Sequence, residues 1–335
     1  MSAVAIVQTA FIGDVVLATP LFEASRTARP SDRIIGVVRA GCDNLLGNNP
    51  FVDEVIVWDK HGHDRGPGGL VRIARLLRER SVDTALIPHR SLRTSLALYL
   101  SGARTRIGFA KGGGALLHSV CVPYRLGIHE VERNLMLVRA AGWNADGFAP
   151  KIFPDEQDRS IVDDIVGNFG PYCVFAPGSV WATKRWPVES YIQVGSAIVG
   201  KGLQVVVSGG PDDSVSCTAI AAGVPGAVDT CGLLSLRQSA ELYRRSRFVL
   251  TGDTAPQHIA AAMGTWVFAL FGPTVRDFGF WPYSERGVVI EENVECRPCG
   301  VHGHRECPDR TYRCMKSITH KKVIGIIDEM VGFEK

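Results

Sequence analysis

The stretch TAFIGDVVLATP, residues 9–20, places Gly13 and Asp14 between an apolar run and a helix-like run. A carboxylate at the start of a helix commonly caps free backbone N–H groups. The same carboxylate, at the carboxyl end of a strand, can also accept a proton from a hydroxyl group. The stretch leaves both interpretations open: a structural cap and a general base.

A second polar loop, APGSVWATKRWP at 176–187, combines Gly178, Ser179 and Lys184. Backbone amides, a hydroxyl and a cation in one strand-to-helix loop suit a phosphate group. The loop lacks the P-loop spacing, so simple nucleotide hydrolysis is not indicated. The alternative is a surface loop with a stacked tryptophan.

The segment TGDTAPQHIAAAMG follows another strand-like run and predicts a helix that starts near Pro256. Asp253 and Thr254 are typical helix caps, yet the same helix start would also stabilise a diphosphate, with Asp253 reaching a sugar hydroxyl. His258 lies one turn along, where a histidine is more often structural than functional.

The segment SGGPDD, residues 208–213, offers two glycines and the acids Asp212 and Asp213 as a weak ribose-binding pattern. No GxGxxG follows the first strand, which argues against a nicotinamide enzyme.

Four of the nine cysteines fall within 19 residues near the C-terminus. Thiolates so spaced can close a tetrahedral zinc or iron site, which we prefer over free thiols and over disulfides. His302 or His304 could replace one of the ligands. The predicted ligands are Cys296, Cys299, Cys307 and Cys314.

The charge distribution is uneven although the net charge is only +3. Residues 60–125 contain twelve Lys or Arg against three Asp or Glu, a field that would concentrate an anionic partner. The N-terminus does not resemble an export signal. The apolar stretch 254–275 contains Pro, Gly, Gln and His, which favour loop, helix and buried strand over a membrane span.

Short apolar runs alternate with amphipathic segments, which predicts an α/β protein with parallel sheets. A chain of 335 residues favours two domains. We expect an N-terminal domain over 1–150, a C-terminal domain over 151–320 that includes the Cys-rich segment 296–314, and a helix in 321–335 that packs back toward the first domain. The polar stretch 142–158 is the expected linker. The carboxyl ends of two such sheets would border a central cleft.

The order of the motifs along the chain resembles glycosyltransferase family 9, the ADP-heptose:lipopolysaccharide heptosyltransferases, and particularly the heptosyltransferase II branch. The motifs are IGDVVLATPL, RIGFA, HEVERNL, APGSVWATKRWP, GDTAPQHIAAAMGT, ALFGPT and the terminal CRPC with its later CP and CM. The resemblance implies a GT-B fold of two Rossmann-like doubly wound domains that face a central cleft, the acceptor on the first and the nucleotide sugar on the second.

The resemblance also implies roles for individual residues. Asp14 matches the catalytic base, and Lys184 assists catalysis by contacting the donor diphosphate. Ala255 stands where relatives often have glycine, and either Asp212 or Asp213 would bind the ribose. The implied nucleotide-sugar site comprises Gly13, Gly178, Ser179, Lys184, Asp212, Asp213, Asp253, Thr254, Ala255 and His258.

The expected reaction is an inverting transfer of heptose from ADP-heptose to the anionic inner core of lipopolysaccharide. It needs no cofactor for catalysis, and a structural zinc or iron would occupy the four-cysteine cluster. The lipid-anchored acceptor implies a cytoplasmic enzyme in peripheral contact with the inner membrane face, and no nucleic acid partner is expected. The alternatives are a non-hydrolysing nucleotide-sugar epimerase, which would not need the basic acceptor loops, and a nucleotide-sugar sensor, which would not need Asp14.

Overall fold

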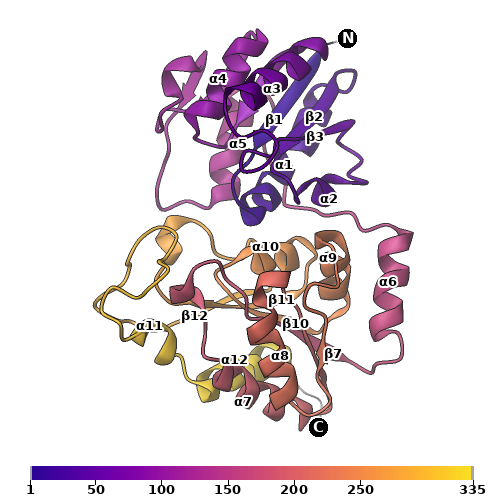
Figure 1. The fold of residues 1–335 in the computed structure, drawn as a ribbon, viewed down its shortest axis with the longest axis vertical. Helices are drawn as coiled ribbons and strands as arrows, with labels where there is room; N and C mark the ends of the chain where they lie inside the picture. The colour runs from indigo at the N-terminus through magenta and orange to yellow at the C-terminus, as the bar shows by residue number, and fades with distance from the viewer. Residues whose placement is uncertain (1, 333–335) are drawn as a thin grey trace. The chain divides into compact units, whose positions relative to one another are not determined.

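The structure is a computed structural model that describes residues 2–332. The chain divides into two compact units, residues 1–153 and 154–335 (Figure 1). Among the helices of residues 2–332, none combines the length and the apolar character needed to cross a bilayer.

The first unit is a parallel sheet of six strands with helices on its faces. The strand order is β3-β2-β1-β4-β5-β6, which is the doubly wound Rossmann order. Its strands are β1 (Ala3–Gln8), β2 (Arg33–Val38), β3 (Glu54–Val57), β4 (Val82–Ile87), β5 (Thr105–Phe109) and β6 (Val120–Val122). Its helices are α1 (Ile12–Ala28), α2 (Asp43–Leu46), α3 (Pro67–Glu79), α4 (Leu92–Ser101) and α5 (Glu130–Ala140), with a 3-10 turn η1 (Ala115–Leu117).

Burial explains this sheet. All six residues of β1 are buried, as expected for a central strand that helices cover on both faces. Helices α3 and α4 pack together, and their Ile73, Leu77 and Leu98 join the strand side chains in one apolar core. Helices α1 and α5 also pack together, and Asn134 of α5 donates a hydrogen bond to the carbonyl of Leu17 (3.2 Å).

The second unit repeats the plan with strand order β12-β11-β10-β7-β8-β9. Its strands are β7 (Tyr172–Ala176), β8 (Gln204–Val207), β9 (Val228–Asp229), β10 (Phe248–Gly252), β11 (Trp266–Phe271) and β12 (Gly287–Glu291). Its helices are α6 (Glu156–Val166), α7 (Val188–Val199), α8 (Ser214–Gly223), α9 (Leu236–Arg245), α10 (Ala255–Ala262), α11 (Arg313–Lys316) and α12 (His320–Val331), with 3-10 turns η2 (Ala182–Lys184), η3 (Pro211–Asp213) and η4 (Arg276–Phe278).

The last helix, α12, has its apolar face in the second unit. It packs against α7, and Val323 and Ile327 belong to the same core as Tyr191 and Ile198 of that helix. The C-terminal end of the predicted helix falls on residues outside the described range.

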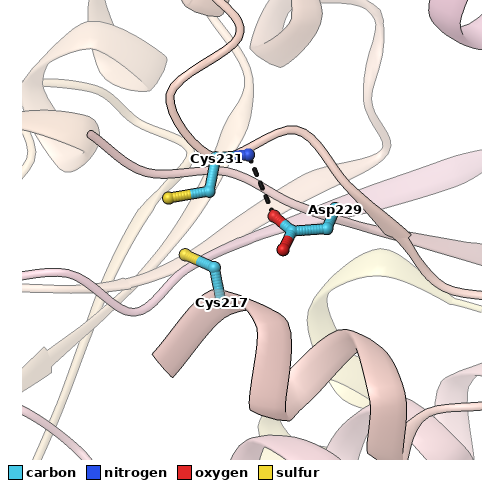
Figure 2. Close-up of side chains that lie close together, drawn as sticks. All are labelled: Cys217, Asp229 and Cys231. Atoms are coloured by element: carbon cyan, nitrogen blue, oxygen red, sulfur yellow. Dashed lines mark hydrogen bonds between the residues drawn. The ribbon is translucent and has the colours of Figure 1, made fainter. Parts of the chain in front are cut away.

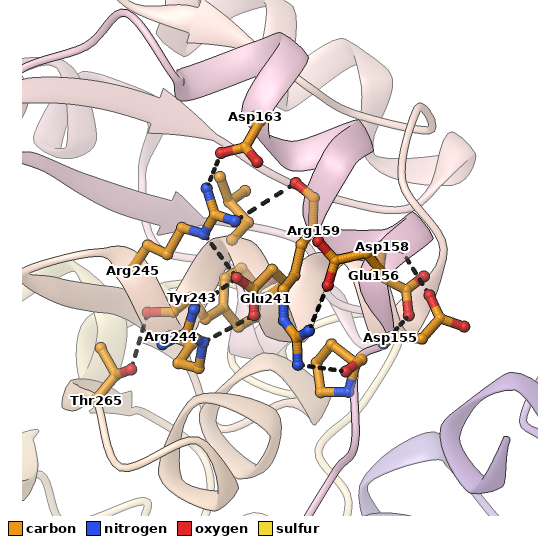
Figure 3. A network of polar contacts seen from close by, with 12 residues as sticks. Asp155, Glu156, Asp158, Arg159, Asp163, Glu241, Tyr243, Arg244, Arg245 and Thr265 are labelled. Carbon is orange, nitrogen blue, oxygen red and sulfur yellow. Dashed lines mark hydrogen bonds and ion pairs between the residues drawn. The ribbon is translucent and has the colours of Figure 1, made fainter. Parts of the chain in front are cut away.

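The predicted linker, 142–158, is wrong at its C-terminal end because α6 begins there. Asp155 caps this helix, and Asp158 reaches back to the Asp155 N–H in a capping box. Arg245 of α9 then joins Asp163 of α6 to Glu241, as Figure 3 shows. Helix α6 is therefore an integral part of the second unit.

Candidate active site

The two sheets have the same topological switch point, where the strand order reverses. In the first unit it lies between β1 and β4, and in the second between β7 and β10. Ligands of open α/β sheets bind at the carboxyl ends of the strands at such points. The predicted site residues that follow β1, β7 and β10 therefore lie where this topology places ligands.

Asp14 lies in the first turn of α1, directly after β1. The helix begins at Ile12, so Asp14 is its third residue and not the cap residue itself. Its Oδ2 accepts a hydrogen bond from the backbone N–H of Phe11, the N-cap residue (3.1 Å). The carboxylate does stabilise the start of the helix, as the structural interpretation required.

The protonation of Asp14 is unusual for a helix cap. Burial raises the pKa of its carboxyl group to about 7, and the negative charge of Glu130 adds to the effect. The Phe11 hydrogen bond and the charge of Arg90 oppose it. A carboxylate with a pKa near neutrality is matched to the work of a general base.

Glu130, which begins α5, is itself buried and paired. It accepts hydrogen bonds from Arg133 (2.6 Å) and from the Tyr124 hydroxyl (3.3 Å). The guanidinium groups of Arg90 and Arg133 lie 4.1 and 4.7 Å from the centroid of the Tyr124 ring. Burial raises the pKa of Glu130, whereas Arg133 lowers it. Arg90 thus belongs to the surroundings of Asp14.

A second cluster at the same sheet edge was missed by the sequence analysis. The ammonium group of Lys60, three residues after the end of β3 at Val57, donates to the hydroxyls of Thr9 and Thr94, both at 2.7 Å. The Thr9 hydroxyl also lies 2.8 Å from Nδ1 of His89, which follows β4. Asp14 was identified because it follows a predicted strand. Lys60 and His89 also follow strands, so the same criterion would have identified them.

Burial controls the charges of this cluster. It lowers the pKa of Lys60 to about 7, with the charge of Arg93 adding to the effect. It also lowers the pKa of His89 to about 3, helped by Lys60 and Arg90, so His89 is neutral near pH 7. The face of Trp58 lies 4.1 Å from the Lys60 ammonium group and contributes a cation–π contact.

In the second unit, Lys184 and Asp253 meet across the switch point. The Lys184 Nζ lies 2.6 Å from Asp253 Oδ2 and also donates to the Asp253 carbonyl (2.9 Å). Both side chains are buried. The structure therefore joins two residues that the sequence analysis assigned to the donor separately.

Two residues that the sequence analysis missed hold Asp253 in place. The Thr274 hydroxyl, after β11, donates to Oδ2 (2.7 Å), and the Gln257 amide donates to Oδ1 (2.8 Å). Oδ2 is shared by Thr274 and Lys184, whereas Oδ1 accepts the Gln257 amide and keeps a further acceptor position. Asp253 therefore positions Lys184, and its contact with a sugar hydroxyl stays a prediction.

Helix α10 begins beside this pair. Thr254 is its cap residue, but its side chain makes no capping hydrogen bond. The backbone amides around Ala255 are therefore not satisfied by that side chain, and helix N-termini of this kind bind anions. His258 is buried one turn further along, with Nε2 3.5 Å from the Gln257 amide nitrogen.

Gly178, after β7, touches the loop that follows β8. A Cβ atom at Gly178 would lie 2.1 Å from Oδ2 of Asp213, so only glycine allows this approach. The same oxygen accepts a hydrogen bond from Gly210 N–H (3.0 Å). Asp213 thus lies against the predicted phosphate loop, whereas Asp212 is exposed. Ser179, also buried, accepts the Trp181 N–H (3.1 Å).

The four C-terminal cysteines lie near one another as free thiols. Cys307 donates to Asp309 Oδ1 (2.8 Å) and accepts the Tyr312 N–H (3.4 Å). Burial raises the pKa of Cys299, and Cys296 and Cys307 add to this. Within residues 2–332 no three of these sulfurs lie within 4.8 Å of one another, so the cluster is looser than an assembled metal site.

A shallow hollow of about 450 Å³ lies elsewhere on the first unit, and none of the predicted site residues lines it. Its lining residues are Val122, Arg125, Ile128, Glu132, Met136 and Arg139. The predicted residues instead form two groups: Gly13 and Asp14 in the first unit, and the remaining nucleotide-sugar residues around the second switch point.

Two Rossmann-like domains with polar clusters at matching switch points define a protein of the GT-B class. Residues 70–308 match the sequence profile of glycosyltransferase family 9 (heptosyltransferase). The chain belongs to this family and is therefore a glycosyltransferase.

Individual relatives agree with the assignment. The chain is similar to lipopolysaccharide heptosyltransferase 2 of Salmonella typhimurium, with 25% identity over 85% of this chain and 86% of the relative. Its fold is similar to a family 9 glycosyltransferase from Veillonella parvula, with a TM-score of 0.85, 22% identity and coverage of 98% and 97% of the two chains. The ADP-heptose LPS heptosyltransferase II of E. coli gives a TM-score of 0.81 at 22% identity, covering 98% of both chains. These structures confirm the predicted α/β fold of two doubly wound domains.

Proposed function

We propose that this glycosyltransferase moves a heptose from ADP-heptose to the anionic inner core of lipopolysaccharide, with inversion at the anomeric carbon. The names of the relatives support this donor and acceptor, since they include an ADP-heptose LPS heptosyltransferase II and a lipopolysaccharide heptosyltransferase 2. The mechanism rests on the Asp14 carboxyl group. This group lies at the switch point of the first sheet, and burial raises its pKa to about 7.

In the proposed step, Asp14 is the general base. It takes the proton of an acceptor hydroxyl as that oxygen bonds to the anomeric carbon. The bond from this carbon to the donor phosphate oxygen breaks at the same time, and ADP leaves with the electron pair. A single displacement inverts the anomeric configuration, and the proton on Asp14 then passes to solvent.

The second unit would bind and stabilise the leaving diphosphate. Lys184 and the Ala255 amide lie together at the start of α10, whereas the Thr254 N–H already donates to the Gly252 carbonyl (2.8 Å). Preorganised donors aimed at developing charge contribute about 3 to 4 kcal/mol each in oxyanion holes. Gly178 and Ser179 would complete the phosphate loop, with Asp213, rather than the exposed Asp212, toward the ribose. His258 supports the same helix start. No metal takes part in the proposed chemical step.

The basic first unit would bind the acceptor. Arg90 lies in the surroundings of the Asp14 edge and carries positive charge suited to phosphate and carboxylate groups. Lys60, whose pKa is lowered to about 7, adds positive charge when it is protonated. An acceptor anchored in lipid would place the enzyme in peripheral contact with the cytoplasmic face of the inner membrane. This contact needs no spanning helix.

The decisive experiment incubates the full chain with ADP-heptose and a heptose-deficient lipopolysaccharide core. We expect release of ADP and an acceptor mass increase of one heptose, with NMR of the product giving the inverted anomeric configuration. Hydrolysis of the donor without transfer would contradict the acceptor assignment.

A matched pair of variants tests the base. Asp14→Asn should keep donor binding and lose about 10²- to 10⁴-fold in turnover, the usual contribution of general base catalysis. Asp43→Asn is the control, because Asp43 also lies in a first helical turn after a strand but is exposed. Near-normal turnover in Asp14→Asn would remove Asp14 from the mechanism.

We also propose a structural zinc or iron at the four-cysteine cluster. The donor set suits these metals, and the backbone N–H bonded to Cys307 is the kind of outer contact that orients a thiolate ligand. Because the sulfurs are not at metal-binding distances, the ligands would have to close around the ion. Metal analysis of the purified protein and of Cys296→Ser tests this, and equal metal content in the two would refute it.

A further inference from the structure

A second group of metal-binding side chains lies outside the four-cysteine cluster. The ligand atoms of Cys217, Asp229 and Cys231 all lie within 4.8 Å of one another. Figure 2 shows the three side chains grouped between a helix and a loop. It is the one such group of three His, Cys, Asp or Glu residues in the described chain, 2–332. The sequence analysis did not identify it, because these cysteines are 14 positions apart and belong to different elements.

The fold fixes the three side chains from two directions. Cys217 is on α8, on the side that packs against the sheet, and is fully buried. Asp229 ends the edge strand β9, and Cys231 follows two residues later, half-buried. The group therefore joins a helix to the edge of the sheet, with one side closed by the core.

The carboxylate is already oriented by outer contacts. Asp229 Oδ1 accepts the Cys231 backbone N–H (2.9 Å), and Oδ2 accepts the Thr218 hydroxyl (3.0 Å). Each carboxylate oxygen has a further lone pair for a cation. In the described part of the chain, Asp229 makes no ion pair with Lys, Arg or His. The group thus combines two sulfur donors with one oriented oxygen donor, and no positively charged side chain pairs with that carboxylate in the described residues.

We propose that Cys217, Cys231 and Asp229 form a zinc site with three protein ligands and a fourth position for water. Zinc prefers tetrahedral sulfur, nitrogen and oxygen ligands, with Zn–S distances of about 2.3 Å. Two sulfurs on one tetrahedral zinc are then about 3.8 Å apart, so the present separations close by about 1 Å or less. Binding releases the two thiol protons, and the site carries one net negative charge.

The site lies directly beneath the loop 208–213. The Cys231 thiol donates to the Gly210 carbonyl (2.9 Å), and the Gly232 N–H donates to the Gly209 carbonyl (2.9 Å). A Cβ atom at Gly209 would lie 2.9 Å from the Cys217 sulfur. Zinc binding removes the Cys231 proton and with it the bond to Gly210. Zinc occupancy is therefore coupled to the conformation of this loop, a consequence for donor binding that rests on the proposed function.

The test measures zinc binding itself, in the full chain with Cys296→Ser and Cys299→Ser as background to remove the other cluster. Reduced, chelator-treated protein is titrated with Zn²⁺ against a chromophoric chelator. We expect one equivalent bound, two protons released, and a sulfur-to-metal charge-transfer band when Co²⁺ replaces zinc. Adding Cys231→Ser or Asp229→Asn should weaken binding at least about 10- to 100-fold, and Thr218→Val by about 10-fold.

Cys121→Ser is the control, since Cys121 is an exposed thiol of the first unit and should leave the titration unchanged. Circular dichroism and thermal melting check that the variants fold. Unchanged zinc affinity in both folded Cys231→Ser and folded Asp229→Asn would overturn the proposal. So would a Cys217–Cys231 disulfide in the purified protein, seen as the loss of two hydrogens by mass and reversed by reductant. None of these readouts depends on sugar transfer, so failure here is distinguishable from failure of the proposed function.

Discussion

Replacing Asp14 by asparagine should remove turnover and, at the same time, make the protein more stable above neutral pH. The pKa of Asp14 is raised from 3.8 to about 7, mainly by burial and by Glu130. The folded state therefore binds more protons than the unfolded state between these values, and wild-type stability falls as pH rises through this window. The variant has no charge to bury and does not show this loss.

The size of the effect follows from the shift. Three pKa units correspond to about 4 kcal/mol, and because the side chain is half-buried, solvent screening lowers the expected gain to about 2 kcal/mol. Asparagine keeps a side-chain oxygen that can accept the Phe11 N–H, so the helix cap survives. The gain should be small near pH 4, grow through the window and level off near pH 8.

Urea unfolding of wild type and Asp14→Asn at several pH values measures this. With a slope of about 2 kcal/mol/M, the midpoint at pH 8 should rise by about 1 M. A carboxylate of ordinary pKa in the first helical turn gives the opposite sign, because asparagine keeps the hydrogen bond but loses the charge, which costs about 0.3 to 1 kcal/mol at pH 8. A variant that is less stable than wild type at pH 8 would refute the raised pKa.

Three further substitutions test the site. Lys184→Ala should weaken ADP binding and lower the free energy of unfolding by about 3 to 5 kcal/mol, because it leaves Asp253 buried without its cation. Adding Asp253→Asn should restore the stability measured by urea unfolding. The ADP affinity measured by calorimetry should stay low. Gly178→Ala should weaken ADP binding, since its methyl group displaces the carboxylate that packs 2.1 Å from the Cβ position. Glu130→Gln removes a charge that raises the Asp14 pKa, so the acid limb of the pH–rate profile, which falls below about pH 7, should move to lower pH.

Each of these substitutions has a control. Lys201→Ala removes a lysine of a surface ion pair, Gly325→Ala places a methyl group in open space within α12, and Glu132→Gln neutralises a partly exposed neighbour. Unaltered ADP affinity in Lys184→Ala, or in Gly178→Ala, would contradict the assignment of that loop. An unmoved acid limb in Glu130→Gln would contradict the electrostatic coupling.

The central strands were predictable because burial on both faces leaves an unmistakable apolar run. The apolar runs AVAIVQ and RIIGVV predict buried strands, and they coincide with β1 (Ala3–Gln8) and β2 (Arg33–Val38). β5 and β12 were not identified as strands, since polar or charged residues in the outer strands interrupt the pattern. Helix α6 was missed because its capping box lies in a polar stretch that resembles a linker.

The site was predictable residue by residue but not as a set of contacts. A polar side chain after a strand can be identified from local sequence, which is why Asp14, Lys184 and Asp253 were found. The pairing of Lys184 with Asp253, 69 positions apart, depends on β7 and β10 being neighbours in the sheet. The pKa of Asp14 likewise depends on Glu130, which arrives from α5.

The Lys184–Asp253 pair has a consequence for turnover under the proposed function. A lone ammonium group would hold a departing diphosphate with its full charge, whereas this one is already neutralised by a carboxylate that Thr274 and Gln257 fix in place. The attraction for ADP is thereby moderated, and product release is eased after each transfer. ADP carries more negative charge than ADP-heptose, so a fully charged lysine would favour the product over the donor. A lower affinity for ADP limits inhibition of the next cycle by the product.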